Sequence, residues 1–217
     1  MIRKLVFAIG GLLLIYAIYL GWRVAVERGR VSDRVNAIIA AADPDERSFP
    51  AERSKTLLAI EDPTFATNKG VDFTTPGGGM TTLSQSLGKR IFFERLRPGF
   101  PKGELIVLTR FALYPKVDKR RTLMAFLATA EFGSRRGRPV VGFADASRTW
   151  LGKPLGALSD AEFLKLVAML PAPARLNPIR NPAANAERVW RIERLLARRC
   201  TPDGLRDVML KGCAASL

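Results

Sequence analysis

Apolar and polar positions divide the chain into one long hydrophobic run and a series of shorter segments with helical spacing. The run over residues 5–22 carries no charged residue and directly follows Arg3 and Lys4. Its length, and the aromatic residues near its far end, are typical of a transmembrane helix with interfacial anchors. A cleaved signal peptide is the alternative, but its apolar core is usually shorter and a small-residue cleavage site should follow. We therefore predict a membrane anchor.

Beyond this run the apolar spacing is mostly helical, and strand-like alternation is scarce. Glycine and proline residues separate the helical segments. The spacing predicts helices over residues 32–41, 51–60, 81–93, 104–113, 119–132, 143–150, 159–169, 184–199 and 203–211. We therefore predict an all-α domain, with at most a small β-hairpin, behind one N-terminal transmembrane helix.

Capping residues support several of these helix boundaries. Ser32 and Asp118 are each placed to cap the helix that follows, and Gly133 is placed to end the second of these helices. Ser159 and Glu162 fit a capping box, in which each side chain bonds the backbone amide of the other residue. Glu162 is therefore predicted to be structural.

Charge narrows the class of partner without choosing one. The chain has 35 Lys plus Arg against 20 Asp plus Glu, a net charge of +15. This balance predicts an anionic partner, such as nucleic acid, acidic lipid or a phosphorylated substrate. The absence of histidine excludes Ser-His-Asp catalysis, and two cysteines alone make a zinc site a poor hypothesis. Cys200 and Cys213 either form a disulfide in an oxidising compartment or stay unpaired, and the sequence leaves both open.

Glu61 is the first candidate for chemistry. It ends an apolar helical segment just before Pro63, where partial burial at the mouth of a cleft would raise its pKa toward the range of a general base. Taken alone, a solvated helix end or a cap is the simpler interpretation.

The next segment has features of an anion site. The glycines at 77–79 let a backbone approach a ligand closely, and Thr81 or Thr82 can cap the following helix, whose first amides favour an anion. Gln85 and Lys89 share one face of that helix. Alone, these residues more often make only a turn and a cap.

In combination and in order, these pieces resemble the peptidoglycan glycosyltransferases of glycosyltransferase family 51, the lysozyme-like polymerases of a lipid-linked cell-wall precursor. The resemblance runs from about residue 54 to residue 196. The family's first motif is a Glu-Asp pair, then Phe, His and Gly. It stands here as Glu61, Asp62, Phe65, Asn68 and Gly70.

Further motifs follow in the family's order. The second resembles a Gly-Gly-Ser-Thr-Ile-Thr-Gln-Gln-Leu-x-Lys-Asn string and lies at residues 79–90. A segment like the family's Tyr-Phe-Gly-Lys lies at 149–154, and further similar pieces lie at 158–162, 170–173 and 177–178. The resemblance implies a lysozyme-like fold.

Several departures from the family pattern bear on activity. Asn68 replaces a histidine, Ser86 replaces a glutamine, and Tyr114 stands where the family has a glutamate. The connection over residues 71–76 is shorter than in the family. Residues 102–104 are the nearest match to the basic residues and second glutamate of the third motif.

The resemblance implies a residue set for the reaction. Glu61 would be the general base and Glu104 the second carboxylate, with a divalent metal ion, Mg or Mn, held near Glu104. A helix N-terminus that favours acids explains Glu104 equally well. The residues implied to bind substrate are Asp62, Phe65, Asn68, Thr81, Thr82, Gln85, Lys89, Arg95, Arg97 and Lys102.

The implied activity is the polymerisation of lipid II into glycan strands, with release of undecaprenyl pyrophosphate. Candidate partners are lipid II, the growing strand, the membrane and other wall-synthesis proteins, without nucleic acid. Basic residues flank both ends of the apolar run, so they do not orient it. Polymerisation outside the cytoplasm implies a single-pass protein of the inner (cytoplasmic) membrane, with a cytoplasmic N-terminus and a periplasmic or extracellular domain.

The expected organisation is an anchor with its cytoplasmic tip at 1–28, a transglycosylase-like helical domain at 29–199 and a C-terminal helix or tail at 200–217. The chain ends soon after the resemblance does, so a monofunctional form without a penicillin-binding domain is expected.

Three other functions stay open. The departures also suit a transglycosylase-like protein that has lost turnover and acts as a scaffold or binding component of wall synthesis. A lysozyme-like hydrolase would share the cleft glutamate without needing a cationic site for the leaving group. A membrane-tethered nucleic-acid binder would use the charge, but the sequence has no recognised binding motif or regular interleaving of aromatic with basic residues.

Overall fold

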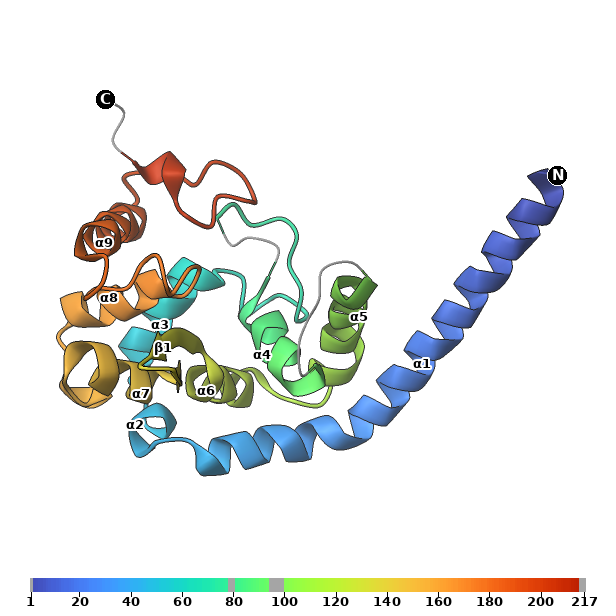
Figure 1. Ribbon diagram of the computed structural model, residues 1–217, viewed down its shortest axis with the longest axis horizontal. Coiled ribbons are helices and arrows are strands. Elements are labelled where there is room, and N and C mark those ends of the chain that lie inside the picture. The colour runs from blue at the N-terminus through green and yellow to red at the C-terminus, as the bar shows by residue number, and fades with distance from the viewer. Residues whose placement is uncertain (1, 78–80, 94–99, 215–217) are drawn as a thin grey trace.

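The computed structural model describes residues 2–77, 81–93 and 100–214, which are mostly helical (Figure 1). The helices are α1 (Ile2–Ala41), α2 (Pro44–Arg47), α3 (Ala51–Glu61), α4 (Leu83–Phe92), α5 (Phe100–Leu108), α6 (Lys119–Thr129), α7 (Phe143–Ala146), α8 (Asp160–Met169) and α9 (Pro182–Leu196). The strands are β1 (Glu131–Arg135) and β2 (Arg138–Val141). Single turns of π or 3₁₀ helix are η1 (Thr109–Leu113), η2 (Ser147–Leu151), η3 (Leu155–Ala157) and η4 (Lys211–Cys213). The mostly helical fold with a small hairpin is confirmed.

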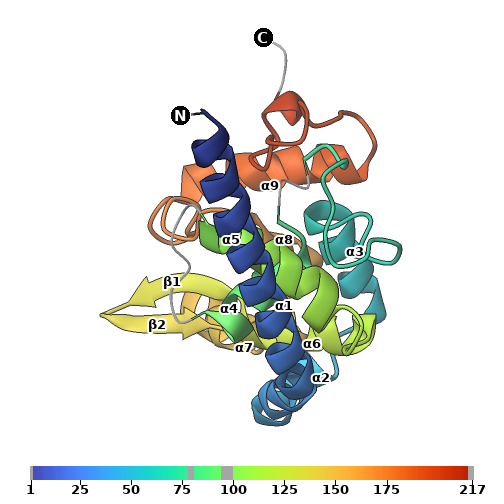
Figure 2. The ribbon, with the colours of Figure 1, turned by 90° about the vertical axis from the view of Figure 1, so that its right-hand side faces the viewer.

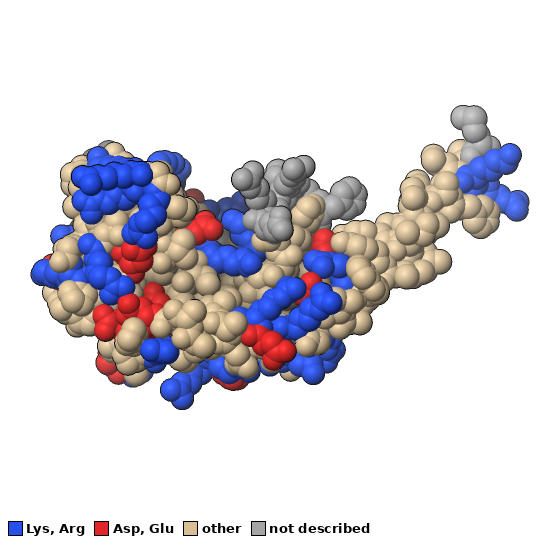
Figure 3. Space-filling model, turned by 60° about the horizontal axis from the view of Figure 1, so that its bottom comes forward, with Lys and Arg blue, Asp and Glu red and all other residues tan. Residues whose placement is uncertain are grey.

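The long helix α1 joins two predicted elements into one. Its N-terminal part projects away from the domain and is long and apolar enough to cross a membrane, with a mean hydropathy of 2.1 over its most apolar window. Figure 3 shows this part as an uncharged rod with basic side chains at its tip. Its C-terminal part packs on the domain, where Val31 and Val35 are fully buried.

The prediction that Ser32 caps a separate helix was wrong. Ser32 lies within α1, and its hydroxyl donates to the backbone oxygen of Lys116, 3.0 Å away. The helix continues through this position because Val31 and Val35 pack into the core on either side of it. The hydroxyl therefore ties α1 to the segment that precedes α6 and does not end a helix.

The predicted helix over 119–132 ends earlier, and a hairpin begins. Ala130 is extended, and Glu131 opens β1, which pairs antiparallel with β2. Arg136 and Gly137 make the connecting turn with φ values of 51° and 80°, the backbone that two-residue hairpin turns require. Gly133, expected to end the helix, lies instead in the irregular part of the ladder with φ 83°. Figure 2 shows the hairpin projecting from one side of the domain.

The predicted helix over 203–211 was also wrong, because side-chain bonds hold this segment as a loop. The carboxylate of Asp207 accepts from the backbone amides of Asp203, Lys211 and Gly212 at 3.0, 2.6 and 2.9 Å. Only the short turn η4 is helical in this segment. Cys200 and Cys213 are joined by a disulfide that closes the loop, so the open question about these thiols is answered by a bond.

Three helix starts match their capping signals. Asp118 accepts from the backbone amide of Arg121 at 2.8 Å, and Ser159 and Glu162 form the predicted capping box. Thr82 forms a second capping box with Gln85. These bonds satisfy amides that a helix N-terminus leaves without an internal partner.

Two apolar clusters make up the core, and α4 and α6 contribute to both. Leu83 and Phe126 belong to the main cluster, while Leu87 and Ala125 belong to the cluster that α1 covers. The two helices therefore form the seam between the clusters. Packing on both sides holds α4 and α6 rigidly. Residues on their remaining faces are therefore well positioned to form a binding or catalytic site.

Candidate active site

A cleft of about 490 Å³ lies between the end of α3, one face of α4 and the segment that follows α8. Its apolar wall includes Leu105 of α5, Phe126 of α6 and Leu170. Its polar lining residues are Glu61, Thr81, Gln85, Ser86, Lys89, Arg90, Lys102 and Glu131. The fold therefore brings the first two sequence motifs together around one cavity.

Glu61 is the last residue of α3 and keeps a part of its surface open to the cleft. Burial raises the pKa of its carboxyl to about 7, although the charge of Arg188 acts in the opposite direction. Among the described residues, no hydrogen bond or ion pair holds this carboxylate. Glu61 is thus free to accept a proton from a ligand, at a pKa suited to a general base near neutral pH.

Asp62 is buried and fixes the loop to α4. Its carboxylate accepts from the backbone amide of Leu83 at 2.9 Å and from Nδ2 of Asn68 at 2.8 Å. Burial raises the pKa of this carboxyl, and these hydrogen bonds act against the increase. The structure therefore places Asp62 as a clamp between the first motif and the first turn of α4, with its side chain away from the cleft lining.

Asn68 sits at the centre of the same loop. Its Nδ2 donates to Asp62, while its Oδ1 accepts from the backbone amide of Gly70 and from Nζ of Lys119, both at 3.0 Å. The same Nζ lies 4.7 Å from the ring centre of Phe65, which is buried in the core. Asn68 and Phe65 thus shape the loop that presents Glu61, and Lys119 is a supporting residue that the sequence did not reveal.

The start of α4 mixes structural and cleft-lining residues. Thr82 is buried and donates to the backbone oxygen of Gly70 at 2.7 Å, while Gln85 accepts from the backbone amide of Thr82 at 3.0 Å. Gln85 also lines the cleft with its neighbours Thr81 and Lys89. Of the three glycines before this helix, Gly77 has φ 76° and donates to the backbone oxygen of Gly204, and the other two lie outside the described residues.

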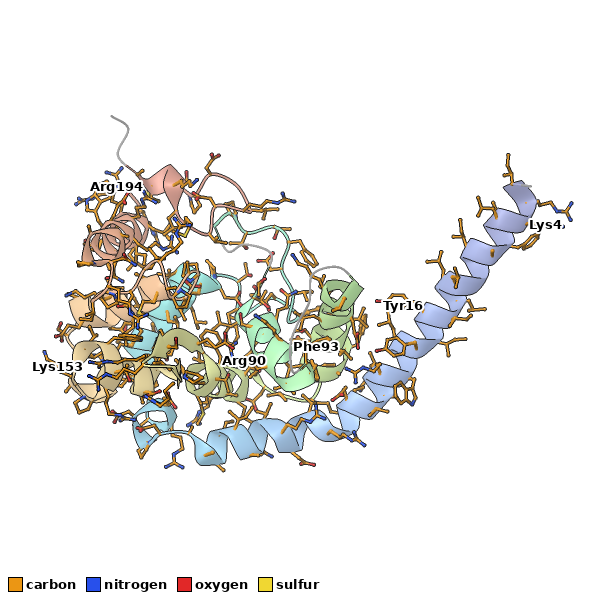
Figure 4. All side chains as sticks on the ribbon, in the orientation of Figure 1. Lys4, Tyr16, Arg90, Phe93, Lys153 and Arg194 are labelled. Carbon is orange, nitrogen blue, oxygen red and sulfur yellow. A yellow bond between two sulfur atoms is a disulfide. The ribbon has the colours of Figure 1, made fainter. Side chains whose placement is uncertain are left out.

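Cationic residues line the cleft near Glu61. Lys89 and Lys102, two of the four basic residues expected to bind substrate, are exposed on it, and Arg95 and Arg97 lie outside the described residues. Arg90, which was not among the predicted site residues, also lines the cleft, and its guanidinium lies 3.7 Å from the carboxylate of Glu131. Figure 4 shows Arg90 near the middle of the domain, far from Lys4 at the tip of α1.

Glu104 faces α1 and is not part of the cleft lining. Its carboxylate accepts from Nε of Arg23 at 2.7 Å and from the hydroxyl of Tyr19 at 3.2 Å. Glu27 extends this cluster through ion pairs to Arg23 and Arg34 at 3.0 and 2.9 Å. In the described part of the chain, Glu104 therefore ties the domain to its long N-terminal helix.

The position of Glu104 beside Arg23 also decides whether Glu104 could hold the expected metal ion. Glu104 is already bound by a guanidinium, and within residues 2–77, 81–93 and 100–214 no three Asp, Glu, Cys or His side chains gather as a metal site. Divalent metals such as Mg²⁺ need several oxygen ligands in a regular geometry. The described residues therefore do not fit a metal at Glu104.

Comparison with known proteins agrees with this geometry. The family model for the transglycosylase family matches residues 40–198, most of the chain. The chain belongs to the transglycosylase family. The resemblance drawn from the motifs is thereby confirmed.

The chain is similar to proteins named biosynthetic peptidoglycan transglycosylases. Those of Burkholderia cenocepacia (strain HI2424) and Burkholderia vietnamiensis are each 30% identical over 154 residues, and that of Burkholderia multivorans is 29% identical. Each match covers 64% of this chain and 60% of the relative. The chain thus spans about three fifths of the length of these relatives.

Three of the departures from the family pattern, Asn68, Tyr114 and the short connection, make contacts of their own in the structure. Asn68 donates and accepts as a neutral histidine can, and it bonds Asp62 and Lys119 in this way. The ring of Tyr114, in place of a glutamate, lies 5.3 Å from Nζ of Lys119. In the short connection, Thr64 and Thr75 donate to Asp72, and these bonds hold the pKa of Asp72 below its usual range although burial acts to raise it.

Proposed function

We propose that this chain is a peptidoglycan glycosyltransferase that polymerises lipid II into glycan strands and releases undecaprenyl pyrophosphate. The observation that carries the proposal is Glu61, a carboxyl without a hydrogen-bond partner among the described residues and with a pKa of about 7, in a cleft that also holds several cations. A glycosyl transfer with a pyrophosphate leaving group needs these two things: a base for the incoming hydroxyl and positive charge for the departing group.

In the proposed reaction, Glu61 takes the proton of a sugar hydroxyl of the acceptor. The hydroxyl oxygen attacks the anomeric carbon of the donor, and the bond from that carbon to the pyrophosphate oxygen breaks with inversion. The pyrophosphate leaves with the bonding electron pair, next to Lys89, Arg90 and Lys102. Lys89 and Lys102 are exposed on the cleft, and Arg90 lines it partly buried beside Glu131, so the three cations stabilise charge as it develops on the leaving group.

The long helix α1 gives the domain its place at a membrane. We propose a cytoplasmic N-terminus, an inner-membrane anchor and a domain outside the cytoplasm, where other wall-synthesis proteins are candidate partners. The disulfide between Cys200 and Cys213 supports this orientation, because disulfides persist in oxidising compartments. The continuity of α1 into the core keeps the cleft close to a lipid-linked substrate.

The second candidate is a transglycosylase-like scaffold without turnover. Its support is Glu104, the predicted second carboxylate, which is bound to Arg23 and Tyr19 and does not line the cleft. In that case the cleft would hold the lipid-linked disaccharide without transferring it.

Lipid II polymerisation by purified full-length protein in detergent micelles separates the two candidates. The enzyme makes polymer, and Glu61→Gln stops it while lipid II still binds. A scaffold binds lipid II and makes no polymer in either form. Glu162→Gln is the matched control, because Glu162 is a carboxylate of a helix cap outside the cleft.

A further inference from the structure

A buried arginine lies behind the cleft glutamate. Arg188 is on α9, which packs against α3, and its residue is only 3% exposed. Its Nε and Nη1 atoms are buried and have no hydrogen-bond partner among the described residues. Burying a guanidinium without hydrogen-bond partners costs free energy of folding. The burial of Arg188 therefore indicates that its positive charge acts on a nearby negative group.

The charges around Arg188 leave one carboxylate that nothing else compensates. The groups that act on it are Glu61, Asp207 and Arg191. Asp207 is occupied by three backbone amides, and Arg191 donates to Glu187 and to the backbone oxygen of Met209. Glu61 accepts no hydrogen bond from a described residue, and no ion pair within 4.0 Å joins it to Arg188.

We propose that Arg188 is a positioning residue for Glu61: its fixed positive charge favours the carboxylate form of Glu61 without bonding to it, so that the oxygens stay free for the acceptor hydroxyl. This inference rests on the proposed function for its purpose. The two residues belong to helices far apart in sequence, and only the packing of α9 on α3 brings them together.

The lack of a direct bond between Arg188 and Glu61 is part of the proposal. A direct bond from Arg188 would hold Glu61 ionised but occupy its oxygens and make it a weak base. Without any nearby cation, burial of Glu61 would keep the carboxyl protonated at neutral pH. The other charged groups near Glu61 are Asp62, next in the chain, and the cleft-lining residues Lys89, Arg90, Lys102 and Glu131.

The direct test measures the titration of Glu61 by carbon NMR on full-length protein in micelles, with carboxyl-labelled glutamate. The Glu61 signal is the one missing from Glu61→Gln. We expect its midpoint to rise by about one pH unit in Arg188→Met, as loss of one nearby opposite charge requires, and to stay near the wild-type midpoint in Arg188→Lys. An unchanged midpoint in Arg188→Met would overturn the proposal.

Arg194→Met is the matched control. Arg194 is on the same helix, and its buried Nε also has no hydrogen-bond partner among the described residues. Its guanidinium stacks 4.9 Å from the ring centre of Trp190, but it is not among the charges that act on Glu61. We expect its midpoint to equal that of wild type. An equal rise in both variants would show a general effect of disturbing α9 and would also overturn the proposal.

A second measurement needs no Arg188 variant. In the wild type, an arginine Nε signal should shift with pH at the midpoint of Glu61, and this shift should be absent from Glu61→Gln. Absence of any such signal in the wild type contradicts the proposal even where Arg188→Met does not fold.

The pH profile of polymerisation then separates positioning from a structural role. In Arg188→Met the acidic limb should move up with Glu61, and the rate should recover at high pH, whereas a structural defect lowers the rate at every pH. If the wild type makes no polymer, the proposed function fails, while the titrations still decide whether Arg188 acts on Glu61.

Discussion

Glu61 differs from the other carboxylates of this protein through its surroundings. Asp62, its neighbour, is held by an amide and an asparagine, and Glu104 is held by Arg23. The carboxyl of Glu61 accepts no hydrogen bond from a described residue, and its pKa is raised by burial and by the charge of Asp62 and lowered by the charge of Arg188. The motif singled out this residue, but the feature that suits it to proton transfer comes from side chains of other elements.

The raised pKa of Glu61 has a consequence for stability. The folded state holds a proton at this site up to a pH of about 7, whereas the unfolded chain releases it near 4.5. Stability therefore falls as pH rises through this window, because the folded state binds more protons. We expect Glu61→Gln to be more stable than wild type by about 1–3 kcal/mol at pH 8, with the difference vanishing below about pH 4, where the carboxyl is protonated in both states. Urea unfolding at the two pH values measures it, and an equal difference at both would contradict the assignment.

Asn68 makes a second prediction at this scale. Asn68→Ala leaves Asp62 and Lys119 short of a partner inside the loop, and we expect a loss of about 1–3 kcal/mol in unfolding free energy. Asn68→His, which restores the family's residue, should lose less than half of this. Thermal unfolding compares the variants, and equal losses would show that the amide network is not what holds the loop.

Among the elements, local signals predicted those helices that begin with their own caps. The caps at Thr82, Asp118 and Ser159 lie in the sequence beside the amides that they bond, so the helices that follow were found. The helix expected over 203–211 failed because Asp207 and the disulfide hold that segment through contacts that spacing does not reveal.

The residues of the candidate site also divide into those that local motifs predict and those that only tertiary packing brings in. The sequence identified Glu61, Gln85 and Lys89 because each lies in one of two adjacent motifs. It missed Glu131 and Arg188, which arrive from β1 and α9 through tertiary packing. Arg90 could have been found from its place directly after Lys89 on a cleft-lining helix.

The C-terminal loop is an element whose stability depends on its disulfide. It packs closely on Gly77, where an added Cβ would lie 2.5 Å from Cγ of Pro202. We expect the pair Cys200→Ser and Cys213→Ser to lower the unfolding free energy by about 2–4 kcal/mol. Reducing agent should produce the same loss in wild type and no further loss in the double variant. Equal stability of the two proteins without reductant would contradict this expectation.

For the whole molecule, α1 serves both as anchor and as part of the core. Its projecting part is exposed, whereas Val31 and Val35 are buried against α4 and α6 residues such as Leu87 and Ala125. The cluster of Glu104, Arg23 and Glu27 lies where the helix meets the domain. A tilt of the anchor is therefore coupled mechanically to the domain, in contrast to an anchor on a flexible linker.

Two truncations test this double role. Deleting residues 2–18 should release the protein from membranes and leave the domain folded, because the deleted residues lie outside both clusters. Deleting residues 2–35 should unfold it, because two fully buried valines are lost at about 1 kcal/mol or more each. Membrane flotation and circular dichroism read the two outcomes. A folded protein after the longer deletion would show that α1 is only an anchor.

The most direct test of the central claim is the rate of glycan-strand formation from lipid II by the full-length protein, measured from about pH 5 to about pH 9. We expect polymer from the wild type, with an acidic limb near pH 7 where Glu61 loses its proton, and a rate at least about 100-fold lower for Glu61→Gln. Polymer formed equally well by Glu61→Gln, or no polymer from the wild type at any pH, would contradict the account.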